Sequence, residues 1–281
     1  EKGSTSSSIL VSSGKQIDLL VQNEESFGAL LQHFTGSKYH NVALRELALK
    51  KGYSLSEKGI KLLKQKGQPI KTFKAEEEFY KFLEMDWVVP EMRENKGEIE
   101  FALKHKLPKI IDVKDIKGDL HMHSSFEIEP SHDMGKDSME DMLKHAKELG
   151  YEYLAFSEHN PSTSTHSKDK IYSMLARRKE KIEQIRKSIK NVHIINLLEV
   201  DILPHGELAI DDRAFDYIDG AIVSIHSVFR TPRDEMTKRV LNGLSHPKAR
   251  IFAHPSGRLI NQRDGYDLDW DKLFDFALKN N

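Results

Sequence analysis

The C-terminal half of the sequence alternates short apolar runs with longer charged stretches, and this alternation limits the folds open to the chain. Five runs have the length and composition of β-strands: IKGDLHMH, YEYLAFSEH, VHIINLLEVDIL, YIDGAIVSIHS and ARIFAHPSG. Most of the segments between them can form helices, and from Met174 to Ile189 apolar residues recur at helical spacing. Repeated strand and helix units predict an α/β fold with a parallel sheet or barrel.

Each of the five predicted strands ends in at least one side chain that can bind a metal ion. Residues two apart on a strand project from the same face, so paired residues at this spacing can face one centre. The C-terminal strand ends of a barrel line one mouth, so we expect the side chains to converge there. In chain order they are His121 and His123, His159, Glu199 and Asp201, His226, and His254.

The sequence contains no cysteine, so a bound metal ion must be held by His, Asp and Glu. Such nitrogen and oxygen ligands suit Zn²⁺, Mn²⁺ or Fe²⁺ better than Ca²⁺ or an isolated Mg²⁺. Adjacent ions of this kind activate water and clamp the oxygens of an in-line displacement, so the cluster predicts phosphate ester hydrolysis. Arg258, four residues after His254, is a candidate to bind the phosphate through two parallel hydrogen bonds from its guanidinium.

The N-terminal part begins with a predicted hairpin, in which SSSILV and QIDLLV flank the turn SSGK with Gly14 available for positive φ. Two helices follow: EESFGALLQHF up to a break at Thr35-Gly36, then KYHNVALRELALKKG, which ends at Gly52. The segment from Arg45 to Lys74 contains nine basic residues and only two acidic ones. This is a local basic patch in a chain of net charge −1.

Two later stretches, DWVVPEMRENKGEIE and KHKLPKIIDVKD, are linker-like in their prolines and mixed charge. We therefore expect one domain over 1–105, a linker over 106–115 and a second domain over 116–281. No apolar run approaches the ~20 residues of a membrane span, and no export signal is recognised. The composition favours a soluble, cytoplasmic protein without a membrane partner, and a monomer is the simplest expectation.

The C-terminal part resembles the PHP (polymerase and histidinol phosphatase) family of metal-dependent phosphoesterases. The resemblance rests on GDLHMHSS, GYEYLAFSEHN, LLEVDILPHGEL, SIHSVF and IFAHPSGRLI, in that order. It implies a distorted (β/α)₇ barrel with up to three Mn²⁺ or Zn²⁺ ions, with Glu199 bridging two of them. The ligands implied are His121, His123, His159, Glu199, His226 and His254, with Asp133 in the stretch SSFEIEPSHDMG and His132 as the alternative to it. The family closes its site with a later Asp-x-His motif, so the last strands and two ligands are expected to be absent from this chain.

The N-terminal part resembles the late palm and thumb of family X DNA polymerases, through the stretch from GKQIDLLV to LSEKGI. The resemblance implies that Asp18 is the third carboxylate of the polymerase metal site. It places the FTG element, from Phe34 to Gly36, beside the nucleotide sugar, and Asn41 and Arg45 near the nascent base pair and the template. His33 stands where many members have Tyr. The other two palm carboxylates would precede residue 1, so Mg²⁺ and dNTP belong to the intact polymerase.

Three functions are consistent with these patterns. The leading hypothesis is a DNA-repair enzyme of the family X polymerases whose PHP domain hydrolyses phosphodiesters at DNA 3′ ends, with exonuclease, AP-endonuclease or 3′-phosphatase activity. The basic stretch 45–74 supports a DNA partner, because Lys and Arg contacts to phosphate supply affinity without sequence preference. The alternatives are a small-molecule phosphatase acting on a substrate like histidinol phosphate, and a non-catalytic DNA-binding module.

Overall fold

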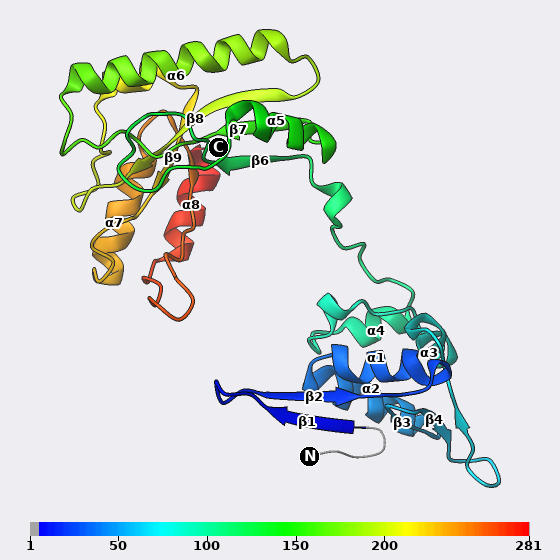
Figure 1. Ribbon diagram of the computed structural model, residues 1–281. Coiled ribbons are helices and arrows are strands. Elements are labelled where there is room, and N and C mark those ends of the chain that lie inside the picture. The colour runs from blue at the N-terminus through cyan, green and yellow to red at the C-terminus, as the bar shows by residue number, and fades with distance from the viewer. Residues whose placement is uncertain (1–5, 281) are drawn as a thin grey trace. The chain divides into compact units, whose positions relative to one another are not determined.

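The protein is represented by a computed structural model, which describes residues 6–280. Its contacts divide the chain into two compact units, with the boundary between Ile110 and Ile111 (Figure 1). That boundary falls inside the segment 106–115, which the sequence suggests as a linker. Each unit is described by itself.

The first unit opens with the hairpin that the sequence predicts. Strands β1 (Ser6–Leu10) and β2 (Gln16–Leu20) pair in antiparallel register, with Ser8 opposite Asp18. Gly14 in the turn has a φ of 79°, a conformation that costs glycine little. The two predicted helices follow, as α1 (Phe27–Thr35) after the 3₁₀ turn Glu24–Ser26, and α2 (Lys38–Lys50). The Ser37 side chain accepts a hydrogen bond from the backbone NH of His40 and caps α2.

A small antiparallel sheet and two short helices complete the first unit. The sheet has the order β3 (Tyr53–Ser56), β4 (Gly59–Leu62), β5 (Ile70–Lys71). Helices α3 (Glu76–Phe82) and α4 (Glu98–Leu103) flank a 3₁₀ turn at Pro90–Met92. The core of this unit joins residues of α1 and α2 to the sheet and to α3, among them Ala29, Leu44, Ile60, Phe73 and Phe79.

The linker-like interpretation of the stretch DWVVPEMRENKGEIE, residues 86–100, is wrong, because this stretch folds into the first unit. Val88 and Ala102 are fully buried in the first core. Arg93 is also fully buried, donating to the Glu76 carboxylate at 2.8 Å and to the Val88 carbonyl at 2.8 Å. The prolines and charges that suggest a linker therefore include buried ion-pair partners, which composition alone does not distinguish from solvated charges.

The second unit contains one parallel sheet of five strands in sequential order, as the repeated strand and helix pattern predicts. The strands are β6 (Gly118–Met122), β7 (Tyr153–Phe156), β8 (His193–Asp201), β9 (Gly220–Ser224) and β10 (Ala249–Phe252). The helices are α5 (Met139–Glu148), α6 (Lys168–Ser188), α7 (Arg233–Leu244) and α8 (Trp270–Asn280), with 3₁₀ turns at Val113–Asp115 and Asp212–Tyr217.

Alternation along the strands assigns the two faces of this sheet. On one face Leu154, Phe156 and Ile194 pack against Ile182 and Ile185 of α6, which runs along that side in Figure 1. The opposite face carries a small apolar cluster that includes Ala155, Leu197, Ile222 and Ala253. Because side chains alternate between faces, the residues two positions beyond Leu197 and four beyond Ala155 lie on the same face as this cluster. Those residues are Glu199 and His159.

Among residues 6–280, each helix is either too short or too polar to span a lipid bilayer.

Gly28 of α1 tests the close packing of the first unit. A Cβ at this position would lie 2.3 Å from the Ala75 carbonyl carbon and 2.7 Å from its nitrogen. Replacing glycine by alanine inside a helix normally stabilises by roughly 0.5–1 kcal/mol, whereas forced overpacking costs about 1–3 kcal/mol. We predict that Gly28→Ala lowers the unfolding temperature measured by circular dichroism. An unchanged or raised unfolding temperature would show that α1 does not approach Ala75 this closely.

Candidate metal centre

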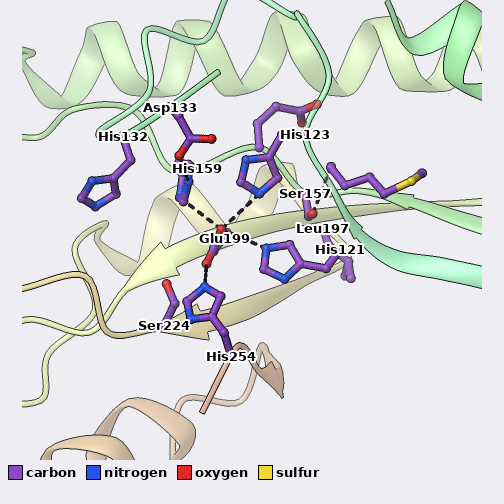
Figure 2. Close-up of polar contacts among 12 residues, drawn as sticks. His121, His123, His132, Asp133, Ser157, His159, Leu197, Glu199, Ser224 and His254 are labelled. Atoms are coloured by element: carbon purple, nitrogen blue, oxygen red, sulfur yellow. Dashed lines mark hydrogen bonds and ion pairs between the residues drawn. The ribbon is translucent and has the colours of Figure 1, made fainter. Parts of the chain in front are cut away.

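A buried carboxylate, Glu199 on β8, lies at the centre of the histidine cluster (Figure 2). Its side chain is only 1% exposed, and imidazole nitrogens surround both of its oxygens. Three nitrogens approach Oε2: His121 Nε2 at 2.9 Å, His123 Nε2 at 3.1 Å and His159 Nδ1 at 3.1 Å. Two approach Oε1: His254 Nε2 at 2.9 Å and His226 Nε2 at 3.4 Å.

The fold brings these histidines together because they sit at one end of five parallel strands. His121 lies within β6 and His123 follows that strand directly. His159 pairs with Glu199 in a parallel bridge, held by hydrogen bonds from Glu199 NH to the Glu158 carbonyl and from Asn160 NH to the Glu199 carbonyl. His226 and His254 each follow the end of their strand by two residues. The convergence expected from the sequence is thus present in the structure.

Two residues near the cluster have a strained backbone conformation. His254 has a φ of 28°, and Val228, two residues after His226, has a φ of 53°. Positive φ is unfavourable for residues with a β-carbon and is concentrated at functional sites in proteins.

A second group lies beside Glu199 and centres on Asp201, which is on the same face two residues later. Asp201 Oδ1 is 2.6 Å from His226 Nδ1, and Asp201 Oδ2 is 3.1 Å from His132 Nε2. The resemblance does not imply Asp201 as a ligand, although its spacing from Glu199 marks it as a member of the cluster. The strand-end pattern of the sequence includes Asp201, and its place beside two histidines adds it to the ligands that the resemblance implies.

Both alternatives for the ligand in the loop after β6 approach the cluster. Asp133 Oδ1 is 3.2 Å from His159 Nε2, and its side chain is 85% exposed. His132 reaches Asp201 instead, so the two residues serve different parts of the site. The loop comes close because of Gly135, where a Cβ would lie 1.9 Å from the His123 carbonyl oxygen. Only glycine permits that approach.

The electrostatics of the cluster favour the ionised carboxylates and a neutral imidazole. Burial by itself raises the pKa of Glu199, but hydrogen bonds from His121, His123 and His254 outweigh it and hold the pKa well below its ordinary value. Burial also opposes ionisation of Asp201, whose pKa is nevertheless lowered by its bond to His226. Burial lowers the pKa of His159 to about 4, so this imidazole is neutral at pH 7. Neutral imidazole and ionised carboxylate are the forms that bind metals.

The arrangement fits divalent cations. Four groups of three residues hold ligand atoms within 4.8 Å of one another: His121, His123 and Glu199; His123, Asp133 and His159; His132, Asp201 and His226; and His159, Glu199 and His226. The Nδ1 of His159 is buried without a hydrogen bond, although Glu199 Oε2 lies 3.1 Å away, because the geometry is unsuitable for one. Buried polar atoms normally have partners, so a ring nitrogen aimed into the cluster indicates a missing one.

The proposed phosphate-binding Arg258 lies in the exposed loop after His254. Its backbone NH is 3.4 Å from Ser256 Oγ, and the preceding Gly257 has a φ of 57°. The side chain is exposed, so it is available to a ligand at this rim. A role in phosphate binding stays a prediction.

In the first unit, Asp18 lies on β2 with an exposed side chain. It accepts hydrogen bonds from Ser8 Oγ at 2.6 Å and from Gln16 Nε2 at 2.8 Å, and these bonds lower its pKa. Within residues 6–280, the groups that could hold a metal ion all lie in the second unit. Asp18 belongs to none of these groups, and its role in a polymerase metal site stays a prediction.

The other residues assigned to nucleotide or DNA contact gather around His33 on α1. Arg45 Nη2 is 3.1 Å from His33 Nδ1, and Asn41 Nδ2 donates to the His33 carbonyl at 3.0 Å. A Cβ on Gly36 would lie 3.2 Å from Asn41 Oδ1, so the absence of a side chain at Gly36 leaves room for the Asn41 side chain. Phe34 is 57% exposed and free for contact with a ligand. The link between His33 and Arg45 is not evident from the sequence, because it joins two helices.

Two protein families match this chain. The model for the PHP domain matches residues 119–277, and the model for the DNA polymerase beta thumb matches residues 30–94. The chain belongs to the family X DNA polymerases that carry a PHP domain. The five parallel strands and the histidine cluster are accordingly those of a PHP domain, and α1, α2 and the small sheet lie in the thumb.

Among the individual relatives, "DNA polymerase/3'-5' exonuclease PolX" of Bacillus subtilis (strain 168) is 35% identical over 265 residues, which cover 94% of this chain. The chain spans 45% of that relative's length. A solved structure described as "Crystal structure of Leishmania infantum polymerase beta: Ternary P/T complex" matches 28% of this chain and 37% of that one. Its identity is 24% and its TM-score 0.26, too low to support a structural argument.

A substitution at Glu199 tests whether the histidine cluster binds metal ions. We predict that Glu199→Gln weakens Mn²⁺ affinity by at least about 100-fold, because even partners outside the ligand shell are worth roughly 10–100-fold. Mn²⁺ titration followed by electron paramagnetic resonance measures the affinity. The matched control is Glu148→Gln, on an exposed carboxylate of α5. Equal Mn²⁺ affinity in both variants would contradict a centre built on Glu199.

Proposed function

We propose that the PHP domain hydrolyses phosphodiesters at the 3′ ends of DNA, as a 3′-5′ exonuclease. The observation that carries the proposal is the ring of five imidazoles around the single buried carboxylate of Glu199, in a chain that also contains a polymerase thumb. The relative from Bacillus subtilis bears both activities in its name, which supports the same pairing here. AP-endonuclease and 3′-phosphatase activities use the same bond chemistry and belong to the same proposal.

The residues that would hold Mn²⁺ or Zn²⁺ are those whose ligand atoms meet at the strand ends. They are His121, His123, Asp133, His159, Glu199, His226 and His254, with His132 and Asp201 beside them. Metal ions held in this way supply Lewis acidity, an activated water and a clamp on the reacting phosphate oxygens. Glu199, with both oxygens faced by imidazoles, is suited to contact more than one ion.

Asp201 supports this site through His226. With the Asp201 carboxylate 2.6 Å from His226 Nδ1, that nitrogen donates its proton to the carboxylate and leaves Nε2 directed at Glu199. Fixing a tautomer in this manner orients a metal-binding imidazole and raises its basicity. Asp133 and His254 are both exposed, so the substrate can reach the site from their side. Arg258, in the exposed loop that follows, would bind a phosphate of the substrate with its guanidinium fork.

The thumb is proposed to bind the DNA backbone. Lys58, Lys61, Lys64 and Lys66 are exposed on and around β4, and within residues 6–280 none of them forms an ion pair. Lys51 and Lys74, by contrast, pair with Glu84 and Glu25. Unpaired lysines on one small sheet give a surface suited to phosphate contacts.

The polymerase activity is proposed for the intact protein. Asp18 would be one carboxylate of a Mg²⁺ site that receives dNTP, with Phe34 and Gly36 beside the sugar and Asn41 and Arg45 near the base pair. One carboxylate does not hold two Mg²⁺ ions, so the residues described here do not make a polymerase site by themselves.

A hydrolysis assay tests the exonuclease. We predict that the full-length gene product with Mn²⁺ shortens a 3′-labelled duplex, and that His123→Ala reduces the rate at least about 100-fold, since metal ions contribute several kcal/mol to such reactions. His145→Ala on the exposed face of α5 is the matched histidine control. Hydrolysis that survives His123→Ala would refute the assignment.

The same assay distinguishes the proposed exonuclease from the alternative, a small-molecule phosphatase. Histidinol phosphate replaces the oligonucleotide, with released phosphate as the readout. We expect faster hydrolysis of DNA than of histidinol phosphate. Faster hydrolysis of histidinol phosphate would contradict the exonuclease proposal and favour the phosphatase. Absence of bound metal and of hydrolysis on either substrate would favour a non-catalytic DNA-binding module.

A triple variant tests the thumb surface. Lys61→Ala, Lys64→Ala and Lys66→Ala together should weaken duplex DNA binding and reduce the slope of log affinity against log salt by about 0.9 for each phosphate that the surface no longer neutralises. Fluorescence anisotropy at several salt concentrations measures both. The matched control removes Lys144, Lys147 and Lys187, which are exposed in the second unit. An equal reduction in both triple variants would show that total charge, not this surface, sets the affinity.

A further inference from the structure

A buried ion pair lies behind the metal centre, on the face of the sheet that α6 covers. Arg178 of α6 is fully buried, and Glu158 is 2% exposed. Arg178 Nε donates to Glu158 Oε2 at 2.5 Å, and Nη2 contacts the same oxygen. Glu158 immediately precedes His159, and because side chains alternate, the carboxylate points away from the histidine cluster.

The pair extends to the strand that carries His121 and His123. Glu158 Oε1 accepts hydrogen bonds from Ser124 NH at 3.0 Å and from Ser124 Oγ at 2.5 Å. Ser124 follows His123 directly and is fully buried. The backbone that carries His123 is therefore tied to the backbone that carries His159 through a single carboxylate.

The guanidinium of Arg178 extends the network to β8. Its Nη2 donates to the Phe156 carbonyl at 2.8 Å and to the Leu197 carbonyl at 2.7 Å, while Nη1 donates to Asn196 Oδ1. Phe156 ends β7, and Leu197 lies two residues before Glu199. The guanidinium of Arg178 thus links β7 and β8 next to the residues that carry the candidate metal ligands.

We propose that Arg178 is a positioning residue for the metal centre, acting through Glu158 and Ser124 to fix the spacing of His123, His159 and Glu199. The inference rests on the proposed metal-dependent function. It goes beyond the ligands themselves, because Arg178 and Glu158 face away from the cluster. A fork with five donors in one plane suits the role, because Arg178 has four acceptor groups and lysine has only three donors, all on one nitrogen.

The rival interpretation is that Arg178 only stabilises the fold, and α6 supplies a control that separates the two roles. Arg186, two helical turns further along α6, donates to the Ile194 carbonyl at 3.0 Å and pairs with Asp219. Ile194 lies near the start of β8, at the opposite end from Glu199. Arg186 therefore ties the same helix to the same strand, away from the ligands.

The test compares Mn²⁺ binding in the full-length protein and in its Arg178→Lys, Ser124→Ala and Arg186→Lys variants. Excess Mg²⁺ is present to occupy sites made of oxygen ligands alone. Ser124→Ala removes the hydroxyl link with little change in volume, so it serves if Arg178→Lys does not fold. Electron paramagnetic resonance gives the Mn²⁺ affinity, and calorimetry gives the unfolding temperature of each metal-free variant.

We expect Arg178→Lys and Ser124→Ala to weaken Mn²⁺ binding at least about tenfold, and Arg186→Lys to leave it within about twofold of wild type, whatever the unfolding temperatures. Wild-type affinity in the folded Arg178→Lys and Ser124→Ala variants would overturn the positioning role and leave the proposed function intact. Failure of the wild-type protein to bind Mn²⁺ would overturn both.

Discussion

A carboxylate buried among imidazoles organises the second unit of this protein. Burying the ionised side chain of Glu199 is unfavourable unless opposite charge or hydrogen bonds compensate for it. Hydrogen bonds from His121, His123 and His254 supply that compensation. The parallel sheet brings five imidazoles within 3.4 Å of the two Glu199 oxygens, from different positions along the chain. The cluster exists because the strand order is sequential and the strand ends share one rim.

The sequence predicts this part of the structure well because strands impose a period of two. Alternation separates Glu199 and His159, which face the cluster, from Asn196 and Glu158, which face α6. The family resemblance then names the histidines. It does not name Asp201 or decide between Asp133 and His132, because their places depend on the path of an irregular loop that Gly135 brings against His123.

Buried charges are what the sequence conceals most. Arg93 and Glu98 lie in a stretch that looks like a solvated linker, yet Arg93 pairs with Glu76, and Glu98 bonds to the buried His40 at 2.6 Å. Arg178 likewise occupies a helix rich in exposed Lys and Arg, and only the structure shows that it alone among them reaches Glu158. Sequence patterns report which residues are charged, whereas burial depends on partners that are distant in the chain.

The central claim is that Glu199 and the surrounding histidines hold metal ions. The most direct measurement is anomalous X-ray diffraction from crystals of the protein grown with Mn²⁺ or Zn²⁺, with data collected on both sides of the metal absorption edge. The account predicts anomalous peaks within coordination distance, about 2.0–2.3 Å, of a Glu199 oxygen and of nitrogens of His121, His123 or His159. Well-ordered Glu199 and histidine side chains without an anomalous peak among them would contradict it.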